Sequence, residues 1–196
     1  MNNTEKPGRL VVISGPSGCG KDTIMNEIFK MDPNIIPSVS ATTRPPRKGE
    51  INGINYYFLS TEEFEQRIRK NEFLEYVRYG ENYYGTLKPQ LDEKLKTGKT
   101  VVLIIDVRGA VNVRKIYPTA KTIFIMPPTE SELEKRLRCR DSDNEDSILR
   151  RLEVAKDEIK CVNEYDYAVV NDELEKAVDT TEGVGKIIKT IIVKYA

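Results

Sequence analysis

The residues best suited to chemistry form one short run near the start of the chain, Gly15-Pro16-Ser17-Gly18-Cys19-Gly20-Lys21. This run fits the pattern G-x-x-x-x-G-K, and it stands between an apolar run at residues 10–14 and a helix-like stretch at residues 22–30. In that context, glycines let backbone N–H groups turn inward around phosphate oxygens, and the helix N-terminus adds partial positive charge. Lys21 supplies a point charge to the β- and γ-phosphates. The run therefore predicts an ATP-binding loop rather than a glycine-rich helix cap.

The residue after Lys21 departs from the usual form of this loop. A Ser or Thr hydroxyl normally meets Mg²⁺ there, but this chain has Asp22, followed by Thr23. A carboxylate near a triphosphate is repelled unless a cation lies between them. Asp22 is therefore either a Mg²⁺ ligand, directly or through water, or an acid in the first turn of a helix, where the helix dipole favours it. The sequence leaves both interpretations open.

Two arginines suggest a second anion site. Arg44 and Arg47 lie three positions apart beside prolines that stiffen the segment. Together with the hydroxyls of Tyr56 and Tyr84, their planar forks suit a monophosphate. Standing alone, the two arginines would be interpreted as solvated surface residues.

The same segment opens a series of motifs that runs through most of the chain. Residues 38–50 read Ser-Val-Ser-Ala-Thr-Thr-Arg-Pro-Pro-Arg-Lys-Gly-Glu. Further landmarks follow in order: Gly53, Tyr56-Tyr57-Phe58, Phe73-Leu74-Glu75, Asn82-Tyr83-Tyr84-Gly85-Thr86, Ile105-Asp106-Val107, Gly109, Pro127-Pro128, Asp166-Tyr167 and Val170-Asn171-Asp172. This series closely resembles guanylate kinases, which are P-loop nucleoside monophosphate kinases. The resemblance implies Mg²⁺-dependent phosphoryl transfer from ATP to GMP, giving ADP and GDP.

The choice of guanine agrees with the residue chemistry. Guanine presents neighbouring N–H donors at N1 and N2, which require acceptors. Glu75 and Asp106 can supply carboxylates, and Ser40 and Thr86 can supply hydroxyls. Adenine would leave buried carboxylate oxygens unpaired, and a site of this kind can reject the wrong partner by ~10⁴-fold. The resemblance places the same four residues at the base, whereas Glu75 alone would be interpreted as a solvated strand charge.

The resemblance also implies the remaining site residues. Because charge develops on several oxygens during transfer, several arginine forks are useful there. The implied catalytic residues are Lys21, Arg44, Arg136, Arg140 and Arg151. The implied ATP-binding residues are Gly15, Pro16, Ser17, Gly18, Cys19, Gly20, Lys21, Asp22, Thr23 and Asn171, the last near the adenine. The implied GMP-binding residues are Ser40, Arg44, Arg47, Tyr56, Glu75, Tyr84, Thr86 and Asp106. Arg138 and Arg150 are expected to be solvated helix residues.

A second departure accompanies Asp22. Guanylate kinases usually carry an acid two residues before Asp106, where this chain has Ile104. We hypothesise that Asp22 replaces the missing acid at the metal. Two alternative functions follow from related proteins: a ribose 1,5-bisphosphate phosphokinase, which shares the Gly-Lys-Asp loop, and a non-catalytic guanylate-kinase-like module that binds phosphopeptides. The intact Lys21 loop and the full arginine signature rank both below guanylate kinase.

Composition excludes several other classes. The 196 residues include no histidine, which removes Ser-His and Cys-His catalysis and histidine metal sites. Lys plus Arg and Asp plus Glu both number 31, so a general nucleic-acid binder with a basic excess is not expected. No apolar run approaches the ~18 residues of a membrane span, and no signal peptide is evident. Three cysteines without metal-like spacing fit a reducing cytoplasm. The expected partners are ATP and GMP, with dGMP as a further candidate, and no nucleic acid, membrane or obligatory protein partner.

The elements that must position these residues alternate along the chain. Apolar runs at residues 10–14, 101–105, 122–126 and 167–170 predict strands, and the patterns between them predict helices at 22–30, 88–96, 111–116 and 131–138. A last helix is expected over 174–195, with an interruption near Gly183 and Gly185. Buried strands separated by helices indicate an α/β fold with a parallel sheet flanked by helices. We predict one domain over 1–196, with a core (1–37, 85–135 and 152–196), an inserted GMP-binding lobe (38–84) and a helical lid (136–151).

Overall fold

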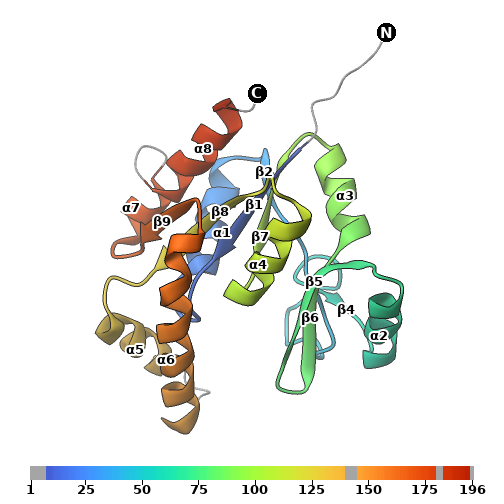
Figure 1. Cartoon of the computed structure of the whole chain (residues 1–196), viewed down its shortest axis with the longest axis horizontal. Coiled ribbons are helices and arrows are strands. Elements are labelled where there is room, and N and C mark those ends of the chain that lie inside the picture. The colour runs from blue at the N-terminus through green and yellow to red at the C-terminus, as the bar shows by residue number, and fades with distance from the viewer. Residues whose placement is uncertain (1–7, 140–144, 180–182, 195–196) are drawn as a thin grey trace.

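The computed structural model describes residues 8–139, 145–179 and 183–194 and has an α/β fold (Figure 1). Its central sheet has the strand order β2-β7-β1-β8-β9 in the described chain, and every neighbouring pair is parallel. These strands are β2 (Ile35–Pro37), β7 (Thr100–Ile104), β1 (Arg9–Ser14), β8 (Lys121–Met126) and β9 (Tyr167–Val170). The predicted parallel sheet is confirmed. The edge strand β2 was not predicted, because three residues carry too little periodicity to be recognised.

Helices cover both faces of this sheet. Alternate residues of β1 point to opposite faces, so Val11 and Ile13 enter one core cluster while Leu10 and Val12 enter another. The first cluster includes residues of α1 (Lys21–Met31), α7 (Leu174–Val178) and α8 (Val184–Lys194). The second includes residues of α3 (Lys88–Lys96) and α4 (Val107–Ile116). The expected last helix is therefore two helices, with Gly183 between them and Gly185 inside α8. The helix expected at 111–116 begins earlier, at Val107.

A second sheet lies beside the first. Its strand order is β4-β3-β6-β5 in the described chain, with β3 (Ala41–Thr42), β4 (Tyr57–Phe58), β5 (Phe73–Tyr79) and β6 (Asn82–Leu87). The helix α2 (Thr61–Arg69) packs on it through Phe64, whose ring stacks on Phe73 with centroids 4.1 Å apart. Ser60 and Glu63 form a capping box at the start of α2. This small separate core makes the inserted segment a structured platform.

Two further helices, α5 (Glu130–Arg138) and α6 (Glu145–Lys160), pack through their own cluster, which includes Leu137 and Ile148. The short 3₁₀ helix η1 (Cys161–Glu164) follows α6. Thr129 caps α5, because its side chain accepts a hydrogen bond from the Glu132 N–H. In Figure 1 the α5–α6 pair and the β5–β6 hairpin project toward the same edge of the molecule.

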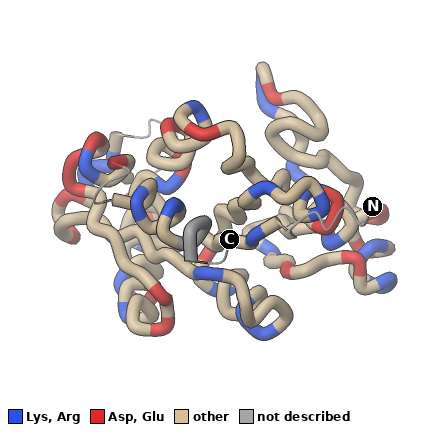
Figure 2. Tube along the Cα trace, turned by 90° about the horizontal axis from the view of Figure 1, so that it is seen from above, with Lys and Arg blue, Asp and Glu red and all other residues tan. Residues whose placement is uncertain are grey.

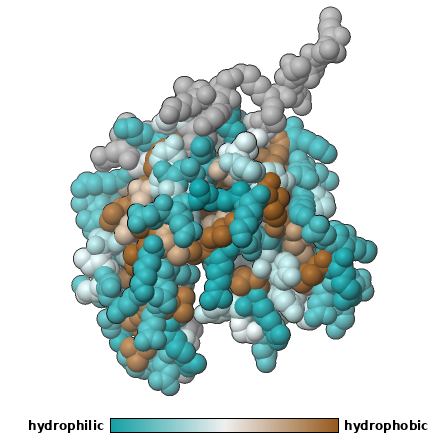
Figure 3. All heavy atoms as spheres, viewed as in Figure 1, coloured by the Kyte–Doolittle hydropathy of each residue, from teal (hydrophilic) through white to brown (hydrophobic). Residues whose placement is uncertain are grey.

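The surface is mixed in both charge and polarity. Figure 2 shows basic and acidic positions interspersed along the chain. On the face drawn in Figure 3, hydrophobic residues form separate areas among hydrophilic ones. No helix within the described residues combines the length and apolarity needed to cross a membrane.

Candidate active site

The loop that was predicted to bind ATP connects β1 directly to α1. Gly20 is the N-cap of α1 and has φ 92°, a left-handed conformation that glycine adopts without strain. The Lys21 ammonium donates hydrogen bonds to the carbonyl oxygens of Gly15 at 2.6 Å and Pro16 at 3.0 Å. The lysine therefore folds back over its own loop. These two carbonyl oxygens hold the Lys21 ammonium close to the backbone of the loop.

Asn171 supports this loop from the end of β9. It is 7% exposed, and its side-chain N–H₂ donates to the Cys19 carbonyl at 2.8 Å. A Cβ atom on Gly20 would collide with the same amide nitrogen, so the close approach requires glycine. Asn171 therefore stabilises the conformation of the loop through this hydrogen bond. Its predicted contact with adenine stays a prediction.

The residues predicted to read a base meet between β5, β6 and α4. Glu75 is 5% exposed, and its Oε1 accepts a hydrogen bond from the Thr86 hydroxyl at 2.7 Å. Asp106 is the N-cap of α4, and its Oδ1 accepts from the Gly109 N–H at 2.7 Å. A Cβ atom on Gly109 would lie 2.9 Å from Glu75 Oε2 and 3.2 Å from Asp106 Oδ1. Both carboxylates therefore converge on one point above a residue without a side chain.

Burial changes the protonation of this group. Desolvation raises the pKa of Glu75 from 4.5 to about 7, the hydrogen bond from Thr86 opposes the rise, and the charge of Asp106 adds to it. A ligand that donates hydrogen bonds to Glu75 favours its ionised form.

The predicted monophosphate residues gather on the face of the small sheet that carries Thr86, because Tyr84 and Thr86 lie two residues apart on β6. The rings of Tyr56 and Tyr84 meet edge to face with centroids 6.3 Å apart. The Arg44 guanidinium carbon lies 5.5 Å from the centre of the Tyr56 ring, within reach of a cation–π interaction. Arg47 is exposed. Ser40, which was predicted to contact the base, is half-buried just before β3. The structure thus brings Arg44, Tyr56 and Tyr84 together, with Arg47 beside them in sequence.

The arginines of α5 and α6 divide into several groups. Arg151 reaches the ATP-binding loop, where its Nη2 donates to the Ser17 hydroxyl at 2.6 Å. Arg136 pairs with Glu132 of its own helix at 3.0 Å. Arg140 lies outside the described residues. Arg138 was expected to be a solvated helix residue, but it links α5 to α6. Its Nη1 and Nη2 donate hydrogen bonds of 2.6 and 2.7 Å to the Glu145 carboxylate.

Comparisons with known proteins decide the family. The family model described as "Guanylate kinase" matches residues 7–187. The chain belongs to the guanylate kinase family. A guanylate kinase of Carboxydothermus hydrogenoformans is 49% identical over 90% of this chain and 87% of its own length. One of Thermosynechococcus vestitus is 47% identical, over 91% and 94% of the two chains. The crystal structure of a guanylate kinase from Anaplasma phagocytophilum aligns with a TM-score of 0.74 at 30% identity, covering 96% and 87%.

The two positions that were hypothesised to share a metal role differ in their exposure to solvent. Asp22 is exposed in the first turn of α1, and Ile104 is partly buried at the end of β7. Burial first, and then the negative charge of Asp22, raises the pKa of Tyr56, so Asp22 lies within electrostatic reach of the monophosphate residues. Among the described residues, no three Asp, Glu, Cys or His side chains form a group that could hold a metal ion alone.

Sequence reasoning missed two acids. Glu158 of α6 is half-buried, and burial raises its pKa while the charge of Lys21 lowers it. It lies seven residues after Arg151 on one helix, a spacing that places both on the same face and could have signalled it. Glu50 ends the arginine-rich signature and pairs with Arg44 at 2.8 Å. The position of Glu50, three residues after Arg47 and outside any helix, gives no sequence pattern that would predict this contact.

Proposed function

We propose that this member of the guanylate kinase family is an ATP:GMP phosphotransferase that produces ADP and GDP. The observation that carries the proposal is the convergence of Glu75 Oε2 and Asp106 Oδ1 above Gly109. Two acceptors at one point match the adjacent N1 and N2 donors of guanine. The family match and the loop around Lys21 supply the other half of the reaction.

The protein's part in the mechanism is positioning and charge stabilisation. The acceptor phosphate is already an anion, so no side chain need act as nucleophile or strong base. Lys21 stabilises charge on the donor phosphates, and Arg44, Arg47, Tyr56 and Tyr84 hold the acceptor phosphate for in-line attack. Arg136, Arg140 and Arg151 are proposed to surround the transferred group. We further propose the division into a core, a GMP-binding lobe (38–84) and a lid (136–151), which must approach one another to exclude water.

The donor set near the loop fits Mg²⁺. This ion prefers oxygen ligands and commonly uses one or two carboxylates together with substrate phosphates. Asp22 offers such a carboxylate, and Thr23 offers a hydroxyl, so the two residues would hold an ion that arrives with ATP. When bound, Mg²⁺ would neutralise charge on the β- and γ-phosphates. The three cysteines are free thiols, which supports the proposed cytoplasmic location.

A coupled assay for ADP tests this function. The purified chain with ATP and Mg²⁺ is offered GMP, dGMP, AMP, UMP and ribose 1,5-bisphosphate in turn. We expect GMP to be the preferred acceptor, with dGMP accepted because no base contact changes. Preference for ribose 1,5-bisphosphate would overturn the proposal in favour of the related phosphokinase. Absence of ATP consumption with every acceptor would favour the phosphopeptide-binding module.

A further inference from the structure

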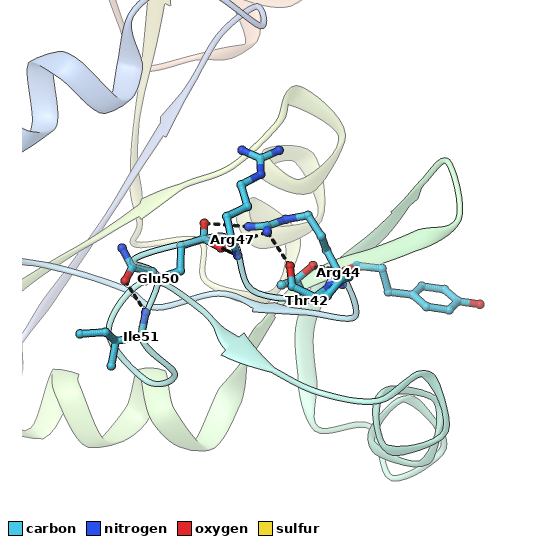
Figure 4. A network of polar contacts seen from close by, with 8 residues as sticks. Thr42, Arg44, Arg47, Glu50 and Ile51 are labelled. Atoms are coloured by element: carbon cyan, nitrogen blue, oxygen red, sulfur yellow. Dashed lines mark hydrogen bonds and ion pairs between the residues drawn. The ribbon is translucent and has the colours of Figure 1, made fainter. Parts of the chain in front are cut away.

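Both carboxylate oxygens of Glu50 bind the guanidinium of Arg44 (Figure 4). Its Oε1 accepts from Arg44 Nη2 at 2.8 Å, and its Oε2 accepts from Arg44 Nη1 at 3.0 Å. Oε2 also accepts from the Arg47 backbone N–H at 2.6 Å. The two side chains are only 13% and 19% exposed. The pair is therefore a fixed bidentate contact and not a loose surface ion pair.

The edge of Arg44 that Glu50 occupies matters. A guanidinium has five N–H donors arranged as two forks, one at Nη1 and Nη2 and one at Nε and Nη2. Glu50 takes the first fork, and the Pro45 carbonyl accepts a further bond from Nη1 at 2.7 Å. Nε donates to neither oxygen of Glu50, so the second fork lies on a different edge of the guanidinium. That fork can bind two phosphate oxygens without displacing the carboxylate.

Aromatic rings lie beside the same group. The Arg44 guanidinium carbon lies 5.5 Å from the centre of the Tyr56 ring and 5.8 Å from that of Phe58. The Tyr56 and Phe58 rings are 5.9 Å apart. With one edge bonded and these rings alongside, Arg44 has little rotamer freedom left to lose when a ligand binds.

We propose that Glu50 is a positioning residue for the acceptor phosphate: it grips one fork of Arg44 and presents the other to GMP. This deepens the proposed function and rests on it. The opposing interpretation is that Glu50 competes with the phosphate for Arg44 and must let go when GMP binds. The bond from the Arg47 N–H favours positioning, because it holds the carboxylate in its own turn independently of Arg44. The two interpretations predict opposite signs for the effect of removing the carboxylate charge.

The chain offers a matched control. Arg67 and Glu72 form another Arg–Glu pair at 2.8 Å in the same lobe, with side chains 37% and 29% exposed. Neither residue belongs to the proposed site. Glu72→Gln therefore removes a carboxylate from an arginine without touching the acceptor phosphate.

The experiment measures GMP and ATP binding by calorimetry, and KM and kcat in the coupled assay, for Glu50→Gln, Glu50→Asp and Glu72→Gln. Loss of pre-organisation predicts that Glu50→Gln raises the Kd and KM for GMP by about tenfold, with the Kd for ATP and kcat changed less than about twofold. Glu50→Asp should recover part of the loss, and Glu72→Gln should bind GMP as the parent does. Tighter GMP binding by Glu50→Gln would overturn the proposal and establish competition. Unchanged GMP binding would also overturn it.

A double substitution separates positioning from general stabilisation of the lobe. If Glu50 acts through Arg44, then adding Glu50→Gln to Arg44→Ala causes no further loss of GMP affinity. An equal further loss in that background would refute the proposal. Thermal unfolding checks each variant, and Glu50→Asp carries the comparison if Glu50→Gln does not fold. A parent chain that binds GMP but transfers no phosphoryl group refutes the proposed function and leaves the role of Glu50 to the binding data.

Discussion

Replacing Glu75 by Gln should stabilise the protein at high pH while weakening its use of GMP. The side chain is 5% exposed, and burial raises its pKa from 4.5 to about 7. A carboxyl with a raised folded-state pKa keeps its proton longer in the folded chain than in the unfolded chain. Between these two pKa values the folded state binds more protons, so the free energy of unfolding falls as the pH rises through that window. At about 1.4 kcal/mol per pKa unit, the full loss is about 3 kcal/mol.

The amide side chain of the Glu75→Gln variant would carry no charge to desolvate. Its carbonyl oxygen can still accept the hydrogen bond from Thr86, which is 2.7 Å long in the parent protein. We therefore expect equal stability of parent and variant near pH 5, and a more stable variant near pH 8 by about 1–3 kcal/mol. The functional effect has the opposite sign. The amide puts N–H groups where guanine needs an acceptor, so kcat/KM for GMP should fall by ~10²-fold or more, with partial rescue if the amide rotates.

Urea unfolding at pH 5 and pH 8 measures the first effect, and steady-state kinetics with calorimetric ATP binding measures the second. The affinity of the parent protein for GMP should also rise as the pH increases through about 7, since the acceptor must be ionised. The rise should be smaller in Glu75→Gln, where the GMP phosphate, with a second pKa of about 6, still titrates. Equal losses for GMP and ATP would refute the assignment of Glu75 to the base. A parent protein that is no less stable at pH 8 than the variant would refute the burial argument.

Four further substitutions test the ATP side. Lys21→Ala should lower turnover by ~10²-fold or more and leave the unfolding transition intact, and near-normal turnover in the folded variant would overturn the loop assignment. Gly20→Ala should destabilise the fold by about 1–3 kcal/mol, seen by urea unfolding, because φ is 92° and the new Cβ would strike Asn171. Asp22→Ser should weaken the Mg²⁺ dependence of activity, and adding Ile104→Asp should restore part of it. Additive effects without rescue would exclude a shared metal role. An unchanged Mg²⁺ titration would show that Asp22 only stabilises the first turn of the helix, by less than ~1 kcal/mol.

The features that sequence predicted well are local in the chain. The loop from Gly15 to Lys21 needs only a preceding strand and a following helix, and both are signalled by neighbouring residues. The strand at Tyr167–Val170 and the helix at Lys88–Lys96 have the predicted ends. The guanine acceptors were predicted by matching a set of motifs, since nothing in the local pattern of residue 75 distinguishes a buried carboxylate from a solvated one.

The features that sequence missed depend on contacts between distant or irregular segments. The strand Ile35–Pro37 owes its existence to pairing with β7, which begins only at Thr100. Arg138 looks like any solvated helix residue until α6 brings Glu145 against it. The helix α6 runs past residue 151, so no change of secondary structure marks the predicted end of the lid, and the extent of the lid stays a prediction.

The equal numbers of acids and bases explain why net charge gives no indication of this site. The chain has 31 of each, yet the proposed site separates them: Glu75 and Asp106 are assigned to the base, and arginines and Lys21 are assigned to the phosphates. Glu50 stands apart as an acid on the phosphate side, bonded to Arg44 and thus reducing local positive charge. A site that only attracted phosphate would lose affinity through such a residue. A site that must orient one phosphate for in-line attack benefits from such an acid. In phosphoryl transfer a protein lowers the activation barrier largely by orienting the reacting groups.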